Sequence, residues 1–195
     1  SGFLPATYQG TLFRQGETPI LNLKPPAGTT DAQERGKLDL LKELNNRYSR
    51  DKQDDSELDA RARSYELAYQ MQTSAPEAIN LSEESEATKK LYGLDDTETA
   101  VYGANCLMAR RLAERDVRFI QLYHRVWDHH LSLPRGIRNA CAAFDQPAAA
   151  LVQDLKKGGL LDDTRVAWAG EFGRTVYSQG KLTADDYGRD HHPRC

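Results

Sequence analysis

Residues 117–124 read "VRFIQLYH" and residues 164–172 read "TRVAWAGEF", and both segments are short and rich in β-branched and aromatic side chains. This composition is typical of β-strands. Between them, "NACAAFDQPAAALVQDLKKGG" (residues 139–159) has helical spacing, with Leu151 and Leu155 in phase and two glycines at its end. A strand, a helix and a second strand form a βαβ unit, with parallel strands and a right-handed crossover. The sequence therefore predicts an α/β fold.

The first 115 residues are expected to be irregular and helical. Residues 1–30 are rich in proline and glycine, which predicts turns. Apolar spacing predicts four helices, near residues 30–49, 56–73, 83–91 and 98–114. The first should begin with a capping box between Thr30 and Gln33. The expected inward faces are Leu38, Leu41 and Leu44 in the first helix, Leu58, Ala62, Tyr65 and Tyr69 in the second, and Val101, Ala104, Met108 and Leu112 in the fourth.

These segments suggest one incomplete domain. Residues 1–115 would be its irregular and helical part, and residues 116–195 its βαβ part, carrying the loops of a metal site. The chain has 195 residues, of which 39% are hydrophobic and 28% charged, so it can bury a core. Three cysteines with no close pair predict neither a disulfide framework nor a cysteine zinc site.

The charge pattern argues against several classes of partner. The net charge is -3, and the chain has no cluster of Lys and Arg with interleaved aromatics, so nucleic acid is not an expected partner. No apolar run approaches the roughly 20 residues that span a bilayer, and the first residues lack a secretory signal pattern.

Three polar segments follow the expected strands. They are "HRVWDHH" (124–130), "GEFGRT" (170–175) and "GRDHHP" (188–193), and all five histidines of the chain lie in the first and third. Ligands of open parallel sheets bind at the carboxyl ends of the strands, so these segments should meet. Mixed imidazole and carboxylate groups suit Zn²⁺, Mn²⁺ or Fe, and with more oxygen ligands Ca²⁺ or Mg²⁺. Arg174 or Arg189 could hold an oxyanion such as sulfate or phosphate.

Other interpretations of these residues stay open. A histidine pair on a loop is often plain polar surface, and Glu171 could be a turn cap with Arg174 as its partner. Trp127 is better explained as a packing residue than as a substrate platform. The sequence contains no glycine-rich phosphate loop, no G-x-S-x-G elbow and no C-x-x-C motif, which argues against nucleotide-binding, serine hydrolase and thioredoxin functions.

Several long motifs resemble one bacterial family. They are "GFLPATYQGT", "PILNL", "LDLLKELN", "SYELAYQMQTSAPE", "CLMARRLAERDVRFIQLY", "WDHH", "DLKKGGLLDDTRVAWAGEFGRT" and "GRDHHP". Together they resemble domain of unknown function 1501 (DUF1501), a sulfatase-like branch of the alkaline phosphatase superfamily. The resemblance implies an α/β/α sandwich with a mostly parallel sheet and a helical N-terminal segment. It also implies an exported or periplasmic protein, often with an upstream twin-arginine signal.

The resemblance implies metal-dependent hydrolysis of sulfate or phosphate esters, with carbohydrate as a candidate partner, by a Ser, Thr or modified Cys nucleophile. By analogy, the ligands of a divalent metal (Zn, Mn, Ca or Mg) would be Asp128, His130, Glu171, Asp190, His191 and His192, with Arg174 and Arg189 acting catalytically on the ester oxyanion. Glu171 stands where many relatives carry an Asp-His pair.

The family pattern begins before residue 1 and continues beyond residue 195, so we expect an internal piece whose nucleophile lies elsewhere. A noncatalytic exported binding or scaffolding domain is the alternative function. A third reading is a purely structural cluster of ion pairs.

Overall fold

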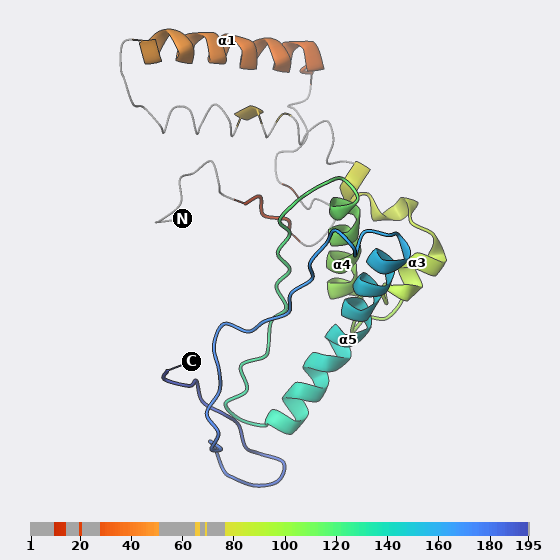
Figure 1. Cartoon of the computed structure of the whole chain (residues 1–195), viewed down its shortest axis with the longest axis vertical. Helices are drawn as coiled ribbons and strands as arrows, with labels where there is room; N and C mark the ends of the chain where they lie inside the picture. Colours follow the sequence, from red (N-terminus) through yellow and green to blue (C-terminus); the bar gives the residue numbers. More distant parts are fainter. Residues whose placement is uncertain are drawn as a thin grey trace. The chain divides into compact units, whose positions relative to one another are not determined.

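A computed structural model describes residues 10–14, 20, 28–50, 65–66, 69 and 77–194. The chain divides into two compact units, Ser1–Asn80 and Leu81–Cys195, and Figure 1 colours them along the sequence.

The first unit contains helix α1 (Asp31–Arg50), which begins as the sequence predicts. The backbone N–H of Thr30 donates to Oε1 of Gln33 at 2.9 Å, and that of Gln33 donates to Oγ1 of Thr30 at 3.3 Å, which confirms the capping box. Leu38 and Leu41 are half-buried, but Leu44 is 52% exposed, so the expected common face is wrong for Leu44. Steps of three residues drift by about 60° around a helix, which carries Leu44 off that face.

The predicted second helix is described only at Tyr65, Glu66 and Tyr69, which are helical. Within this unit, Arg35 binds the carboxylate of Glu66 at 2.8 Å, and the Tyr69 hydroxyl donates to Asp31 at 3.0 Å. The remainder of that helix, with Leu58 and Ala62, and most of residues 1–30 lie outside the described residues.

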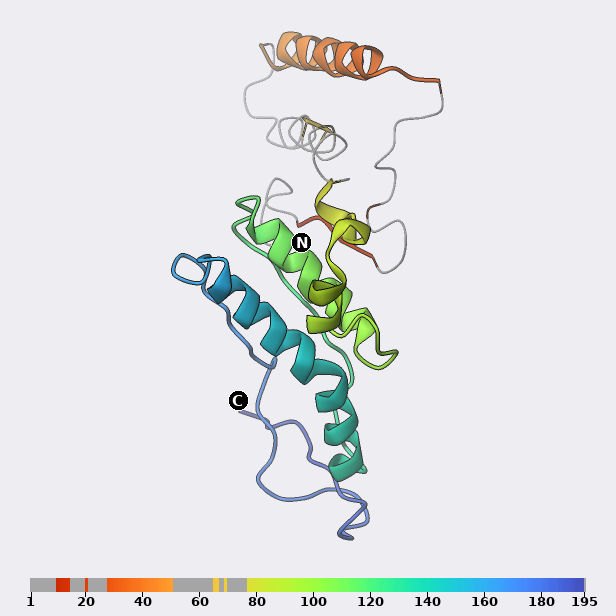
Figure 2. The same cartoon turned by 90° about the vertical axis from the view of Figure 1, so that its right-hand side faces the viewer.

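The second unit holds the helices that follow residue 80, and Figure 2 shows α4 and α5 side by side. They are the short 3-10 helix η2 (Leu81–Glu83), α3 (Glu86–Leu91), α4 (Ala100–Ala113) and α5 (Leu133–Lys157). Ser85 caps α3, because its side chain accepts the backbone N–H of Thr88 at 3.0 Å. The helices predicted near residues 83–91 and 98–114 are confirmed.

Helix α5 is longer than the sequence predicts. It begins at Leu133, with Pro134 in its first turn, where a proline removes no helical hydrogen bond. It also continues through Pro147, which is fully buried. Leu155 is buried in phase with the half-buried Leu151, as expected.

The core of this unit lies between α4 and α5. It consists of Tyr92, Tyr102, Cys106, Leu107, Phe144 and Ala150. Val101 is 53% exposed, so the inward face expected for α4 is wrong at that position. The buried face instead passes through Tyr102 and Cys106, one position further along the helix. Trp127 packs against the core, which agrees with its interpretation as a packing residue.

An ionic cluster joins η2 to α4. The carboxylate of Glu84 contacts the guanidiniums of both Arg110, at 2.7 Å, and Arg111. All three side chains are no more than 12% exposed. Each of these buried charges is stabilised by its partners, because a buried charge that loses its partner lowers the stability of the fold.

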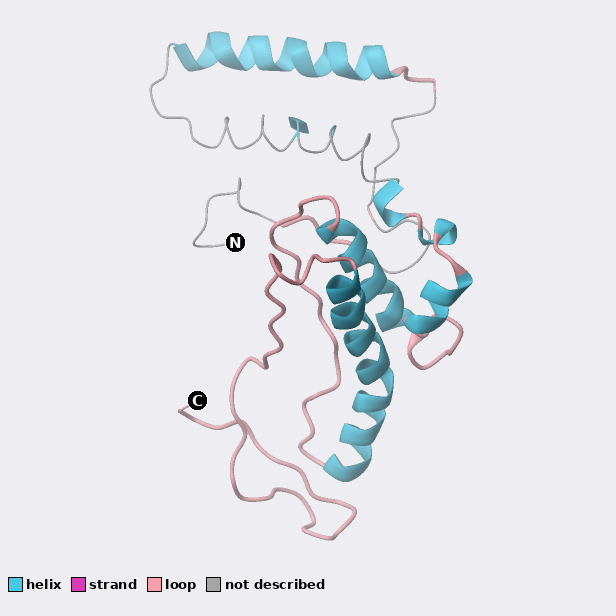
Figure 3. Cartoon of the chain, turned by 45° about the vertical axis from the view of Figure 1, so that its right-hand side comes forward, coloured by secondary structure: helices cyan, strands magenta, loops and turns pink. Residues whose placement is uncertain are grey.

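The expected α/β/α sandwich with a mostly parallel sheet is wrong. Residues 117–124 and 164–172 are extended, but Figure 3 draws them as loops, and no strand occurs in the part of the chain that the structure describes. None of the backbone groups of residues 118–128 and 164–172 is hydrogen-bonded to the backbone of another described residue. A β-strand requires such a ladder, and alternating side chains alone produce only a locally extended backbone. The βαβ unit is therefore an extended segment, a helix and an extended segment.

Within the described ranges, no helix is long and apolar enough to cross a membrane. Cys106 is buried and Cys141 is partly exposed, and both are free thiols. Cys195 lies outside the described residues.

Candidate metal centre

The segments 124–130 and 188–193 do meet, although the described part of the chain contains no sheet that brings them together. The backbone N–H of Arg189 donates to the carbonyl of His129 at 3.0 Å, and isolated antiparallel bridges pair Arg174 with His191 and Gln179 with Gly188. Local pairing of the C-terminal segment thus replaces the sheet edge that the sequence suggested.

Gly188 allows this close approach. A Cβ atom built at this position would lie 2.0 Å from the carbonyl carbon and oxygen of His130. Only a residue without a side chain fits against that backbone.

Three of the predicted ligands lie close together in the structure. One ligand atom from each of Asp128, His130 and His191 lies within 4.8 Å of the other two. Oδ1 of Asp128 is 3.0 Å from Nε2 of His130 and 3.1 Å from Nε2 of His191. We call Asp128, His130 and His191 the triad. All three side chains are partly exposed, at 55%, 36% and 45%, so the group is open to ions.

Gln179 orients the His130 ring from the side opposite Asp128. Nδ1 of His130 lies 3.0 Å from Oε1 of Gln179, and because an amide oxygen only accepts, Nδ1 carries the hydrogen of that bond. In a neutral ring, Nε2 then presents its lone pair to the carboxylate of Asp128. A cation bound between Nε2 and this carboxylate would be coordinated by both.

Arg174 is the other positive charge beside Asp128. Its guanidinium donates to Oδ1 of Asp128 and lies 3.7 Å from the carboxylate of Glu171. The hydrogen bonds from Arg174 and then His191 lower the pKa of Asp128 to about 2. Asp128 therefore stays a carboxylate at every pH at which a metal would bind, which is the form that ligation requires.

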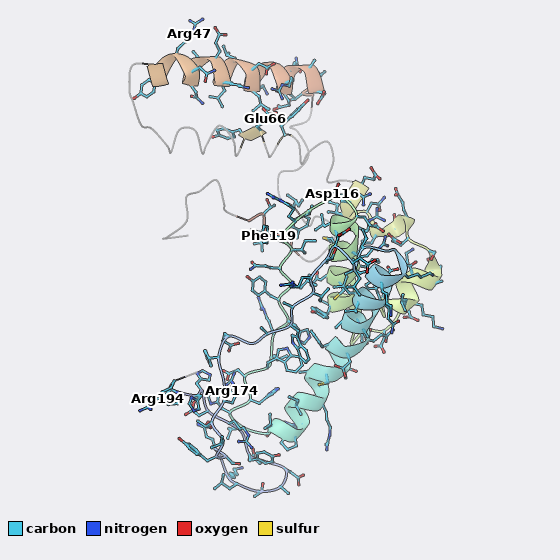
Figure 4. All side chains as sticks on the ribbon, in the orientation of Figure 1. Arg47, Glu66, Asp116, Phe119, Arg174 and Arg194 are labelled. Carbon is cyan, nitrogen blue, oxygen red and sulfur yellow. The ribbon has the colours of Figure 1, made fainter. Side chains whose placement is uncertain are left out.

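The structure places the other predicted ligands outside the triad. Asp190 is nearest, with Oδ1 at 3.7 Å from Nδ1 of His130 and accepting the backbone N–H of His191 at 2.7 Å. Glu171 is 66% exposed and pairs only loosely with Arg174. His192 accepts the backbone N–H of Arg194 at 3.2 Å. Figure 4 shows Arg174 and Arg194 in the same C-terminal part of the chain.

Arg189 and two histidines are engaged elsewhere. The guanidinium of Arg189 donates to the backbone carbonyls of Thr175, at 2.8 Å, and Val176, so it holds the loop that carries Arg174. His124 packs in an aromatic cluster between α4 and α5. His129 lies against Gly136 of α5.

Sequence reasoning missed two contributors to the site, Gln179 and Phe172. A lone glutamine in a polar loop carries no signal for its role. Phe172 lies in the "GEFGRT" motif, and its ring is 4.4 Å from that of His191, with the Arg174 guanidinium 5.5 Å from its centroid. It packs against both a triad residue and the neighbouring cation.

The donor set of the triad fits a divalent metal. One carboxylate oxygen and two imidazole nitrogens are the ligands of open, catalytic metal sites, which keep a position free for water or substrate. The exposure of all three side chains agrees with such an open site.

Comparison with known proteins identifies the family. A family model described as "Protein of unknown function (DUF1501)" matches residues 1–195. The chain therefore belongs to the DUF1501 family. Neither the curated proteins nor the solved structures contain a significant match.

Proposed function

We propose that this protein is a metal-dependent hydrolase of sulfate or phosphate esters, in the sulfatase-like branch of the alkaline phosphatase superfamily. The observation that carries the proposal is the convergence of Asp128, His130 and His191 within 4.8 Å. The sequence resemblance supports the ester class, and it also supports an exported or periplasmic location.

Asp128, His130 and His191 would hold the metal. Two imidazoles and one carboxylate favour Zn²⁺ or Mn²⁺, because Ca²⁺ and Mg²⁺ prefer sites made of oxygen ligands. Such an ion, when bound, polarises an ester oxygen and makes a bound water more acidic. Gln179 keeps the Nε2 lone pair of His130 directed at Asp128.

Arg174 is the residue best placed to bind the oxyanion of the ester. Its guanidinium lies beside Asp128, and the side chain as a whole is only partly exposed, at 24%. Five N–H donors in a planar fork can bind two oxygens of a sulfate or phosphate while one remains on the carboxylate. The guanidinium lies over the Phe172 ring, 5.5 Å from its centroid, and the same ring packs against that of His191 at 4.4 Å.

A second candidate function is a noncatalytic binding or scaffolding domain. It is favoured by the engagement of both arginines: Arg174 already pairs with Asp128, and Arg189 with backbone carbonyls. In that case the polar loops would hold a carbohydrate or a partner protein, and the metal would be structural.

One experiment distinguishes the two candidate functions. The full-length protein is loaded with Zn²⁺ or Mn²⁺, and hydrolysis of p-nitrophenyl sulfate and p-nitrophenyl phosphate is measured. A hydrolase loses activity in Asp128→Asn and keeps it in His192→Ala, the matched control outside the triad. Metal binding without turnover of either ester would instead favour the binding domain.

A further inference from the structure

His124 lies in an aromatic cluster rather than in the metal centre. Its ring centroid is 4.8 Å from that of Tyr102 on α4, 5.5 Å from that of Phe144 on α5 and 5.6 Å from that of Trp127. Trp127 also packs edge-on against Phe144, at 5.6 Å. His124 and Trp127 are therefore both held by the helical core.

A hydrogen bond joins the two side chains. The indole Nε1–H of Trp127 donates to Nδ1 of His124 at 2.8 Å. An indole only donates, so Nδ1 must be the unprotonated nitrogen, and the ring is neutral with its hydrogen on Nε2. A proton added at Nδ1 would set two donors against each other and break the bond.

The same bond closes a strained turn. Val126 lies between the two residues with φ of 66°, a left-handed conformation that a β-branched residue rarely adopts. Such a backbone persists only where its surroundings hold it. The bond from Trp127 to His124 spans this turn, and Asp128 of the triad follows Trp127 directly.

We propose that the Trp127–His124 hydrogen bond is an acid-sensitive anchor that fixes the position of Asp128, so that His124 is a positioning residue of the metal centre. This inference rests on the proposed metal-binding function. It adds a regulatory property to that function, because acid releases the anchor at a distance from the ligands themselves.

Among the groups of this cluster, His124 is the one whose protonation changes in the acid range. Desolvation lowers the pKa of His124, so the anchor is intact at neutral pH and is released in acid. On α4, burial raises the pKa of Tyr102 and brings that of Cys106 to about 12, so both stay neutral throughout the acid range. The ring contact from α5 is Phe144, which does not titrate. Arg125, the charged neighbour on the same segment, is exposed.

The first measurement follows the indole N–H of Trp127 by NMR in the metal-free protein, in a Trp168→Phe background that leaves one tryptophan. We expect a hydrogen-bonded, exchange-protected resonance at neutral pH that loses protection as His124 is protonated. His124→Asn keeps an acceptor near the Nδ1 position but does not titrate, so its resonance should be protected at all these pH values. A pH-independent resonance in the parent, or one unprotected at pH 7.5, would overturn the anchor.

The second measurement is Zn²⁺ affinity by calorimetry at pH 7.5. Loss of an orienting contact outside the ligand set costs about tenfold or more in metal affinity, and we expect this of Trp127→Phe and His124→Phe. His124→Asn should restore the affinity, and Tyr123→Leu, on the exposed side of the same segment, should leave it unchanged. Equal affinity in all variants would overturn the positioning role while leaving the metal site intact. Absence of Zn²⁺ binding by the unsubstituted protein would overturn the metal site and, with it, the positioning role.

Discussion

Nε2 of His191 lies 3.1 Å from Oδ1 of Asp128, although 63 positions separate the two residues in the chain. This contact links the segment after the first extended stretch to the C-terminal loop. It depends on backbone pairing close by, because Arg189 donates to His129 and Gly188 packs against His130. The candidate metal centre therefore depends on this backbone contact between residues 129–130 and 188–189, which we call the clamp.

The clamp should fail when Gly188 acquires a side chain. Gly188→Ala would place Cβ 2.0 Å from the backbone of His130, so the two loops must separate. We expect at least a tenfold loss of Zn²⁺ affinity, as for other changes that displace ligands without removing them. Gly170→Ala is the control, because a Cβ there meets nothing within 4 Å. Equal affinities in the two variants would show that the clamp does not set the site.

Arg174 should control the ionisation of Asp128. The pKa of Asp128 in the folded protein is about 2, below its ordinary 3.8, mainly through the hydrogen bond from Arg174. The stabilisation from this ionised contact is fully present above pH 3.8 and is lost as the pH falls toward 2. In Arg174→Gln the pKa should rise toward 3.8, which carboxyl ¹³C NMR measures.

Arg138→Gln is the matched control for that titration, since Arg138 is an exposed arginine of α5 outside the site. It should leave the pKa of Asp128 near 2. The same pKa in the Arg174 and Arg138 variants would mean that the pairing seen in the structure does not persist in solution.

Glu84 should matter far more for stability than an exposed acid of the same segment. Glu84→Gln removes the carboxylate that Arg110 and Arg111 share, while Arg110 keeps its contacts with Glu114 and Asp154. We expect the lost charged hydrogen bonds to lower the free energy of unfolding by about 2 kcal/mol. Glu86 is 90% exposed and pairs with Lys89, so Glu86→Gln should cost less than about 1 kcal/mol. Urea unfolding followed by circular dichroism compares the two, and similar losses would contradict the role given to the buried cluster.

The helices could be predicted from the sequence because their determinants are local. Thr30 and Gln33 mark the start of α1, and the apolar spacing in α4 and α5 reports helical periodicity. The inward face of α4 was wrong at Val101, although Met108 is buried as expected, because Val101 and Tyr102 are both apolar and only packing distinguishes them.

The predicted sheet failed for a nonlocal reason. Residues 117–124 have the alternation of a strand, with Phe119 and Tyr123 88% and 79% exposed and Leu122 packed on the core. Alternation determines an extended backbone and a buried side. It does not determine whether another strand lies alongside at hydrogen-bonding distance.

The candidate site was predicted in part. The segments around Asp128 and His191 meet, as the sequence suggested, but their contact comes from isolated bridges rather than from a sheet edge. The motif alone could not show which of the adjacent residues His191 and His192 belongs to the triad. The side chain of His192 instead accepts the backbone N–H of Arg194. Adjacent residues point in different directions, so the ligand set required the structure.

The central claim is that the triad binds a divalent metal, and Zn²⁺ titration by calorimetry of the unsubstituted protein beside His191→Ala and His192→Ala tests it most directly. The account predicts one ion per chain, at least a hundredfold weaker binding in His191→Ala, and unchanged binding in His192→Ala. Equal losses in both variants, or no binding by the unsubstituted protein, would contradict it.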